Sequence, residues 1–279
     1  LERIFETMDE PVLVDDAPDA VEVPELTGEV DFEHVDFSYE EGIPVLEDLN
    51  LHVREGESIA LVGPTGAGKS TIINLLCRFY NLGGGRILLH GVDGSVHDIS
   101  KVTLHSLRSQ LGIMLQDSFI FSGSIMDNIR YGRLDATDAE VVEAARRVRA
   151  DAFIQKLPQG YQTEVRERGG NLSQGERQLV AFARTLLSDP SILILDEATS
   201  SIDTQTEKLL QEGIAEMLKG RTSIIVAHRL STIKNCDRIL YISHRGIAEA
   251  GSHEELMARH GLYYDLYTAQ ATESAAQGA

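Results

Sequence analysis

A glycine-rich loop restricts what this chain can fold into more than any other feature of its sequence. The loop, Gly63–Ser70, follows the short apolar run Ile59–Val62. Beyond the loop, apolar residues recur at the spacing of one helix face: Ile72, Ile73, Leu76 and Phe79. A buried strand, a tight glycine turn and a helix in this order predict an α/β unit with a binding loop between its two elements.

The loop fits the pattern G-x-x-x-x-G-K-[ST], which cradles phosphate groups. Its members before the lysine are Gly63, Pro64, Thr65, Gly66, Ala67 and Gly68. The glycines let backbone N–H groups point at phosphate oxygens, and the helix N-terminus adds a positive dipole. We expect Lys69 to reach the β- and γ-phosphates of a nucleotide, Ser70 to bind Mg²⁺ and Thr71 to donate to the α-phosphate. The alternative is a chance glycine turn, which the flanking strand and helix disfavour.

Two carboxylates follow a second buried strand. The run Ile192–Leu195 is apolar, and Asp196 and Glu197 come directly after it. Ligands of open α/β sheets bind at the carboxyl ends of the strands. We therefore expect Asp196 to hold Mg²⁺, directly or through water, and Glu197 to polarise an attacking water. By itself, a strand ending in Asp-Glu is most often a capped turn. Its combination with the phosphate loop favours the catalytic interpretation.

The fold class follows from the pattern along the chain. Buried-type strands are expected at three further places: Ile192–Leu195, Ser223–Val226 and Ile239–Ile242. Their alternation with helices favours a parallel, doubly wound sheet. Polar and apolar residues alternate from Glu29 to Val53, which is typical of antiparallel strands with one solvated face. We predict an α/β fold: a P-loop NTPase core with a mostly parallel sheet, an antiparallel β subdomain, and a helical subdomain over about 117–187.

The first thirty residues differ in composition from the rest. They hold ten acidic residues and one base, Arg3, and so supply nine of the nineteen net negative charges. Leu1–Met8 has the apolar spacing of a helix end, and three prolines prevent its continuation: Pro11, Pro18 and Pro24. We predict a solvated linker within 1–28, a domain over 29–269 and a flexible tail over 270–279.

The overall charge restricts the class of partner. The formal net charge is −19 and the pI is about 4.8, so the surface repels phosphate backbones and no nucleic-acid partner is expected. The two cysteines, Cys77 and Cys236, are too few for a disulfide framework and lack metal-ligand spacing, which favours a reducing compartment. No apolar run approaches the roughly 20 residues of a membrane-spanning helix.

A third motif adds a family resemblance. The segment Leu172-Ser173-Gln174-Gly175-Glu176 is similar to the signature Leu-Ser-Gly-Gly-Gln of ATP-binding-cassette (ABC) transporters. With the other motifs in their fixed order, residues 1–269 resemble the nucleotide-binding domain of an ABC exporter whose membrane and nucleotide-binding parts share one chain. The two departures are Gln174, in place of a glycine, and Glu176, in place of glutamine. Alone, this segment would be a serine cap on a helix.

The resemblance assigns further roles residue by residue. Gln116 matches the glutamine whose amide oxygen completes the Mg²⁺ shell, and His228 matches the histidine that hydrogen-bonds the γ-phosphate. Asp203 stands where the family contacts its opposite subunit, and Tyr39 matches the aromatic that stacks on adenine. Without the other motifs, each would be an ordinary loop, strand-end or packing residue. The other eight histidines are interpreted as structural.

The same resemblance implies ATP and Mg²⁺ as cofactors and hydrolysis at the interface of two such domains. Ser173 and Gly175 would contact the γ-phosphate bound by the other domain. Expected partners are a second nucleotide-binding domain, identical or a sibling, and a transmembrane domain in the same full-length chain. The opening segment Arg3-Ile4-Phe5-Glu6 resembles the linker after an exporter's last membrane helix, so we expect a fragment of a longer protein at the cytoplasmic face of the membrane.

Other ATPases and GTPases fit less well. A soluble or regulatory ABC-type ATPase not coupled to transport is the main alternative, and Glu197 disfavours a module that binds ATP without turnover. A GTPase would carry an Asn-Lys-x-Asp segment, which is absent from the sequence. A chromosome-maintenance ATPase would carry a long coiled coil between Lys69 and Ser173, and no heptads occur there.

Overall fold

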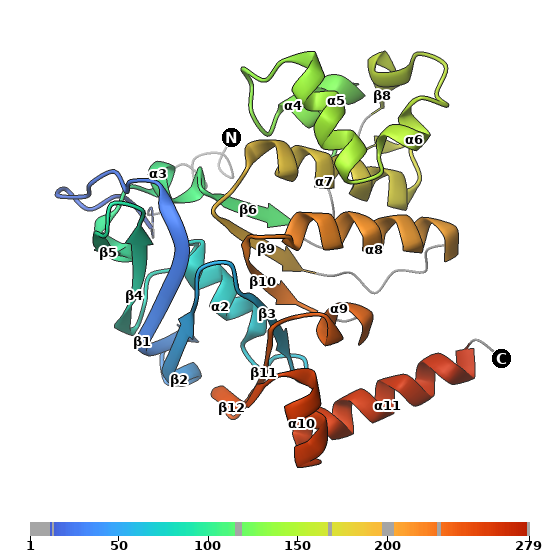
Figure 1. The fold of residues 1–279 in the computed structure, drawn as a ribbon. Helices are drawn as coiled ribbons and strands as arrows, with labels where there is room; N and C mark the ends of the chain where they lie inside the picture. Colours follow the sequence, from blue (N-terminus) through green and yellow to red (C-terminus); the bar gives the residue numbers. More distant parts are fainter. Residues whose placement is uncertain are drawn as a thin grey trace, which may run out of the picture.

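A six-stranded sheet forms the centre of the molecule (Figure 1). The structure, a computed structural model, describes residues 12, 14–114, 119–166, 169–196, 204–227 and 230–277. In spatial order the strands are β12 (Gly246–Gly251), β11 (Arg238–Ser243), β3 (Ser58–Val62), β10 (Thr222–Val226), β9 (Ile192–Asp196) and β6 (Leu111–Met114). All neighbours pair in parallel except β11 and β12. The predicted parallel core is therefore confirmed.

The central strands are apolar because both of their faces are covered. Every residue of β3 and β10 is buried, as expected for the inner strands of a sheet with helices on both sides. In the register of the sheet, Ile225 of β10 lies between Ala60 of β3 and Leu195 of β9. This register brings the carboxyl ends of the three strands to one edge.

A four-stranded antiparallel sheet, in the order β2-β1-β4-β5, packs beside this core (Figure 1). Its strands are β1 (Leu26–Glu40), β2 (Ile43–Val53), β4 (Gly84–Gly91) and β5 (Val96–Asp98). Val30 and Phe32 are buried, while the intervening Asp31 is partly exposed. Their buried face shares one apolar cluster with Ile59 and Leu61 of β3. The predicted antiparallel part with one solvated face is confirmed.

Helix α2 (Lys69–Leu76) follows the glycine loop and ends earlier than its apolar spacing suggested. Ile72, Ile73 and Leu76 are buried as expected. Phe79 is 43% exposed and does not belong to that face. The helix stops because Cys77 caps it and Arg78 takes a left-handed conformation, with φ of 51°, which turns the chain.

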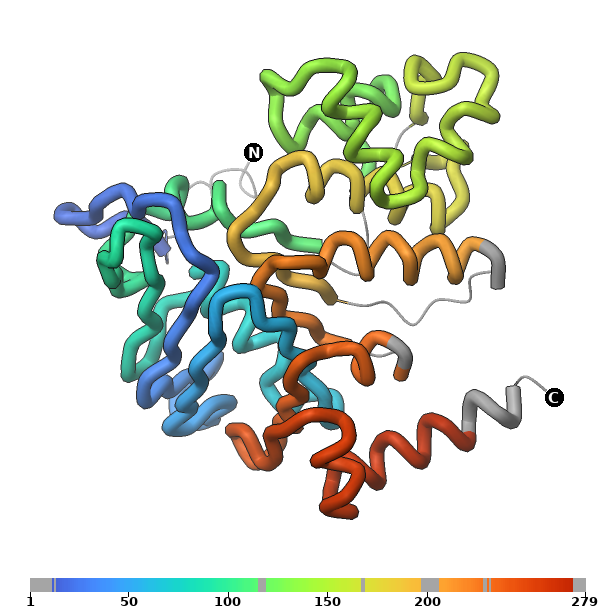
Figure 2. The backbone as a smooth tube through the Cα atoms, viewed as in Figure 1, coloured from blue at the N-terminus to red at the C-terminus, as the bar shows by residue number. Residues whose placement is uncertain are grey.

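Most of the described residues between 119 and 188 form a helical lobe on one side of the sheet (Figures 1 and 2). Its helices are α4 (Ile125–Arg130), α5 (Asp138–Arg147), α6 (Asp151–Ile154) and α7 (Gln174–Ser188), with a two-stranded ribbon of β7 (Gly123–Ser124) and β8 (Glu164–Val165) and the 3-10 turn η2 (Gly160–Gln162). The helical character expected for this stretch agrees with the described residues.

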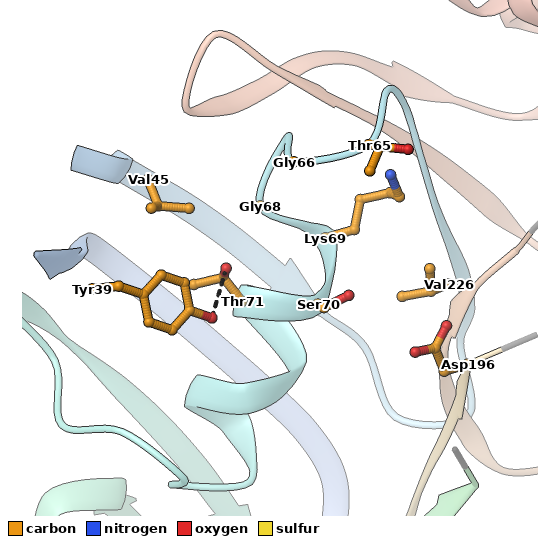
Figure 3. A pocket seen from close by; sticks show the side chains of 10 residues that line it. All are labelled: Tyr39, Val45, Thr65, Gly66, Gly68, Lys69, Ser70, Thr71, Asp196 and Val226. Carbon is orange, nitrogen blue, oxygen red and sulfur yellow. Dashed lines mark hydrogen bonds between the residues drawn. The ribbon is translucent and has the colours of Figure 1, made fainter. Parts of the chain in front are cut away.

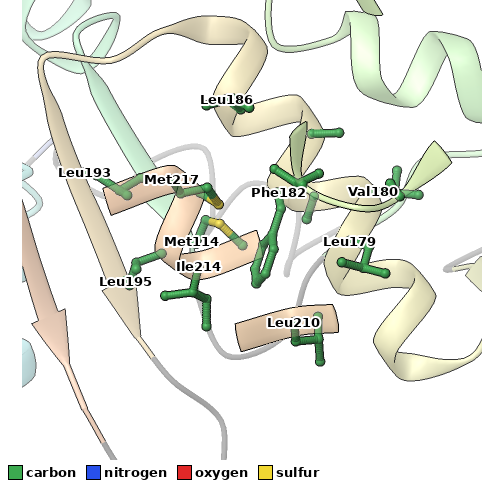
Figure 4. Packing of buried hydrophobic residues seen from close by; sticks show 14 of the residues in the cluster. Met114, Leu179, Val180, Phe182, Leu186, Leu193, Leu195, Leu210, Ile214 and Met217 are labelled. Carbon is green, nitrogen blue, oxygen red and sulfur yellow. The ribbon is translucent and has the colours of Figure 1, made fainter. Parts of the chain in front are cut away.

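Helix α7 joins this lobe to the sheet. Figure 4 shows Phe182 and Leu186 of α7 facing residues of the sheet and of α8 (Thr204–Leu218). Their neighbours in this buried cluster are Met114, Leu193, Leu195, Leu210, Ile214 and Met217. Because these side chains are buried and interdigitate, the start of α7 is held in a fixed position relative to the sheet.

The chain enters and leaves the domain along its surface. Residues 14–25 are mostly exposed and run beside η1 (Ile99–Lys101) and α3 (Leu104–Arg108) (Figure 2). The Val21 N–H donates to the Lys101 carbonyl, and the Thr103 N–H donates to the Val21 carbonyl, at 2.9 Å each. These bonds dock the segment on the domain. Leu1–Met8 lies outside the described residues.

Three helices complete the C-terminal part: α9 (Leu230–Lys234), α10 (His253–Arg259) and α11 (Leu262–Gln277). Helix α11 extends away from the sheet at the end opposite the helical lobe (Figure 1). Its backbone is helical to Gln277, which lies within the segment 270–279 that we expected to be flexible. The helix can continue this far because no proline or glycine precedes Gly278 in that segment. Among the described residues, no helix is both long and apolar enough to span a bilayer.

Candidate nucleotide-binding site

A cavity of about 450 Å³ lies where the carboxyl ends of β3, β9 and β10 meet the start of α2 (Figure 3). Its walls come from four regions of the sequence: 39–45, 65–71, 196 and 226. They are formed by Tyr39, Val45, Thr65, Gly66, Gly68, Lys69, Ser70, Thr71, Asp196 and Val226. The edge of an α/β sheet at which strands deliver their last residues is the usual ligand site of such folds.

The glycine loop has a backbone that only glycine tolerates at its first position. Gly63 has a φ of 132°, and a Cβ placed there would lie 2.3 Å from the carbonyl oxygen of Ile242. Gly68, with φ of 103°, is the N-cap of α2. The loop therefore turns tightly into α2 and exposes the N-terminal N–H groups of that helix, an arrangement that binds anions.

Lys69 is held at the wall of the cavity. Its side chain is buried, and its Nζ donates to the carbonyl oxygens of Gly63 and Pro64, each at 2.8 Å. An ammonium has three N–H donors, so a third can donate to a phosphate oxygen. Burial lowers the pKa of Lys69, and the attraction of the Asp196 carboxylate opposes that change. The cation thus lies between the loop and an acidic group.

Tyr39 stands at the mouth of the cavity, near the end of β1. Its hydroxyl lies 3.1 Å from the Thr71 hydroxyl and accepts a hydrogen bond from the Asn74 amide at 3.3 Å. The ring makes edge contacts with Phe37 and Tyr80, at centroid distances of 4.8 and 5.0 Å. These contacts fix the orientation of a ring that remains 47% exposed, which suits it to stack on a planar base.

Two oxygen donors line the cavity on its other side. Ser70 belongs to the first turn of α2, and Asp196 is the last residue of β9 (Figure 3). A hydroxyl and a carboxylate are hard ligands of the kind that Mg²⁺ prefers when it also binds phosphate oxygens. The residues present therefore fit a magnesium ion. Four other residues assigned from the sequence lie outside the described part of the chain: Gln116, Glu197, Asp203 and His228.

The signature segment opens α7, away from this cavity. Ser173 is the N-cap: its Oγ accepts the Glu176 N–H, and the Glu176 carboxylate accepts the Ser173 N–H at 2.7 Å. Arg177 does not pair with Glu176; it donates to the Leu172 carbonyl at 2.8 Å. Neither Ser173 nor Gly175 lines the cavity that Lys69 forms.

Three residues of the site were not anticipated from the sequence. Val45 and Val226 line the cavity and Asn74 holds the Tyr39 hydroxyl. Val226 could have been found, because it ends a strand in register with Asp196. Val45 and Asn74 carry no local signal, since their role depends on how β2 and α2 pack.

Comparison with known proteins supports the motif-based resemblance. A family profile described as ABC transporter matches residues 46–200. The chain is 51% identical over 266 residues to a fatty acid ABC transporter ATP-binding/permease protein of Mycobacterium tuberculosis, covering 95% of this chain and 41% of that protein. It is 44% identical over 272 residues to an ATP-dependent lipid A-core flippase of Syntrophus aciditrophicus, covering 98% and 44%.

A solved structure agrees with both. The structure of a bacterial Atm1-family ABC exporter with ATP bound matches with a TM-score of 0.86 and 46% identity, over 97% of this chain and 46% of that chain. The chain thus spans less than half the length of these relatives. The predicted family and the predicted fold class are confirmed: the chain belongs to the ABC transporter family of ATPases and forms its ATP-binding domain.

Proposed function

We propose that this domain hydrolyses ATP at the interface of two such domains and thereby drives export by a membrane domain joined to it in one longer chain. The observation that carries the proposal is the cavity in which Lys69, Ser70 and Asp196 converge beside the glycine loop. The relatives, a fatty acid transporter, a lipid A-core flippase and an Atm1-family exporter, support the exporter class.

In the proposed complex, the loop and Lys69 bind the triphosphate. The backbone N–H groups at the start of α2 and the Lys69 ammonium neutralise the β- and γ-phosphates. Thr71 donates to the α-phosphate, and Tyr39 stacks on the adenine. Ser70, Asp196 and Gln116 would hold Mg²⁺, which supplies charge neutralisation of the phosphate oxygens when bound.

Hydrolysis requires a group that orients the attacking water and accepts its proton. Glu197, the residue after Asp196, is assigned that role, and His228 is assigned a hydrogen bond to the γ-phosphate. Both follow strands that end at the edge of the cavity, β9 and β10. These assignments come from the sequence order and the family resemblance.

The position of the signature segment supports a site shared between two domains. Ser173 is exposed and caps a helix of 15 residues, whose N-terminus attracts anions. Because Ser173 and Gly175 do not line their own cavity, we assign them to the cavity of a second domain. Asp203 is assigned to the same interface. ATP then joins the two domains, and its hydrolysis releases them.

An exposed apolar surface that begins three residues after Gln116 in the sequence supports docking of a membrane domain. Phe119, Phe121, Tyr131 and Leu134 are 56%, 39%, 58% and 77% exposed. The ring centroids of Phe119 and Phe121 are 4.9 Å apart, and those of Phe121 and Tyr131 are 4.6 Å apart. Contiguous exposed aromatics of this kind mark interaction sites. The domain would then act at the cytoplasmic face of the membrane, without a nucleic-acid partner.

ATP turnover as a function of protein concentration tests the proposal. A site shared by two domains predicts a greater-than-linear rise of activity. Glu197→Gln is expected to keep ATP binding, lose about 10²–10⁴-fold in turnover and accumulate as a dimer in gel filtration with ATP. Lys69→Ala, the control, is expected to lose ATP affinity and remain monomeric. Linear dependence, or normal turnover of Glu197→Gln, would contradict the proposal. ATP binding without turnover would identify the regulatory alternative.

A further inference from the structure

The solvated face of the antiparallel sheet carries a cluster of ionisable side chains remote from the nucleotide cavity. Glu29 and Asp31 are alternate residues of β1 and project to the same face. The register places His52 of β2 directly opposite Asp31. His90 of β4 follows Leu89, which pairs with Val30. Three neighbouring strands thus bring two carboxylates and two imidazoles together.

Possible ligand atoms of the cluster lie close to one another, although Asp31 and Glu29 approach different nitrogens of His52. The Asp31 Oδ1 lies 2.7 Å from His52 Nδ1, and the Glu29 Oε1 lies 3.9 Å from His52 Nε2. One ligand atom from each of Glu29, Asp31 and His52 lies within 4.8 Å of the other two. In a tetrahedral site with bonds near 2.1 Å, ligand atoms are about 3.4 Å apart. Side-chain rotations that break the hydrogen bond between His52 and Asp31 would bring the three ligand atoms around one ion.

His90 adds the support that metal-binding carboxylates usually have. Its Nε2 donates to Asp31 Oδ2 at 2.7 Å, so it holds the Asp31 oxygen that does not face His52. The side chains of Asp31 and His90 are only 22% and 24% exposed. A hydrogen-bonded partner of this kind orients a ligand and tunes its affinity.

A second histidine–aspartate pair on the same sheet, His34 with Asp48, differs from the cluster in being more exposed and in having no third ligand among the residues that the structure describes. His34 Nδ1 lies 2.6 Å from Asp48 Oδ1, but these side chains are 78% and 73% exposed. Within the described part of the chain, Glu29, Asp31 and His52 form the one group of three or more potential metal ligands. The His34–Asp48 pair therefore serves as a control for the metal-binding experiments below.

We propose that Glu29, Asp31 and His52 bind one divalent ion of the Zn²⁺ type, and that His90 is a positioning residue for Asp31. An imidazole with two carboxylates favours Zn²⁺ over Mg²⁺, which prefers an all-oxygen set. Three protein ligands leave a fourth position for water. The ion would link β1 to β2 on a face that the ATP site does not use.

Metal binding to the untagged, metal-stripped protein tests the proposal. Titration with Zn²⁺ is followed by calorimetry and titration with Co²⁺ by visible absorption, both in excess Mg²⁺ without nucleotide. We expect one ion per chain and a Co²⁺ spectrum of low coordination number. Asp31→Asn and His52→Gln are each expected to lower the affinity at least about tenfold, as removal of a metal ligand does. His34→Gln is expected to bind like the parent.

His90→Gln separates positioning from ligation. It is expected to weaken binding about tenfold while the Co²⁺ spectrum keeps its shape, because the ligand set is unchanged. Circular dichroism without metal checks that each variant folds. If a ligand variant does not fold, Glu29→Gln is tested in its place. The proposal is overturned if the protein binds no Zn²⁺ at concentrations up to about 100 μM. This concentration is far above the dissociation constants of structural zinc sites. It is also overturned if His34→Gln weakens binding as much as His52→Gln.

Discussion

The carboxylate of Glu176 accepts a hydrogen bond from the backbone N–H of Ser173 at 2.7 Å, and the Ser173 Oγ accepts the N–H of Glu176 at 3.3 Å. This reciprocal pair is a capping box. Glu176 therefore has a local structural role, which the usual signature glutamine could also fill. It also leaves a negative charge at the helix end where the proposed mechanism brings the γ-phosphate of a second domain.

The charge at position 176 should weaken ATP-driven pairing of two domains. Glu176→Gln keeps the cap, since glutamine serves equally in a capping box, and removes the charge. Charge effects at a helix end are about 0.3–1 kcal/mol, so we expect a roughly two- to fivefold lower KM for ATP. ATPase assays across ATP and protein concentrations measure this. An unchanged or raised KM would show that the carboxylate does not face the bound phosphate.

Gly63 should be irreplaceable for nucleotide binding. In Gly63→Ala, the new Cβ would meet the Ile242 carbonyl oxygen at 2.3 Å, so the loop must shift away from its phosphate-binding shape. We expect ATP binding to be lost. Gly42→Ala is the matched control, because Gly42 also has a positive φ, of 80°, with nothing within 4 Å of its Cβ position. It should cost about 1 kcal/mol of stability and leave binding intact. Binding of a fluorescent ATP analogue and thermal melts distinguish the two.

Cys77 should be unreactive in the folded protein. Burial raises the pKa of its thiol from 9.0 to about 12, against an opposing effect of Arg108. In a Cys236→Ala background, a thiol reagent at pH 8 is expected to react only at the rate of unfolding, because the thiolate is the nucleophile. Rapid reaction without denaturant would contradict this.

The same thiol makes stability depend on alkaline pH. The pKa of the Cys77 thiol is higher in the folded state than in the unfolded state. Its stabilising contribution to the free energy of unfolding is therefore complete below pH 9. That contribution is lost as the pH rises toward 12. Cys77→Ala should remove this part of the decline. Denaturant unfolding of both proteins between pH 8 and 11 measures the difference.

Arg78 should anchor the segment that precedes the domain. Its guanidinium donates to the carbonyls of Val102 at 2.6 Å and Asp15 at 2.8 Å, and its side chain is only 6% exposed. Arg78→Gln leaves the buried Val102 carbonyl unpaired, which costs about 1–3 kcal/mol. We expect faster hydrogen exchange in residues 14–25.

An exposed ion pair in the same region provides the control. The Lys101 Nζ lies 3.4 Å from the Asp19 Oδ2, and the two side chains are 59% and 71% exposed. Exposed ion pairs of this kind contribute little to the free energy of unfolding. Lys101→Ala should therefore leave both stability and exchange nearly unchanged. Equal effects of the two variants would exclude a special role for Arg78.

Local sequence patterns were sufficient for the parts of the site formed by consecutive residues. The glycine loop is such a part, because β3, a tight turn and α2 follow each other there. The end of β9 is another, because its apolar run leads directly to Asp196. The length of α2 was misjudged at Phe79, since the helix ends through the left-handed conformation of Arg78, which no apolar spacing reveals.

Contacts between distant segments could not be obtained in this way. The pairing of His52 with Asp31 depends on the register of β1 and β2, and so all histidines but one were interpreted as structural. The engagement of Glu176 with Ser173 depends on the cap conformation. The roles of Gln116, Glu197, Asp203 and His228 stay predictions, because these residues lie outside the described part of the chain.

Helix α2 has the phosphate loop at one end and the Arg78 anchor just beyond the other. With eight residues and a rise of about 1.5 Å each, it is about 12 Å long. A helix this short, buried along most of its length, behaves as a stiff rod. Because the Arg78 side chain contacts residues 15 and 16, a displacement of that segment would act on the end of α2 opposite the phosphate loop.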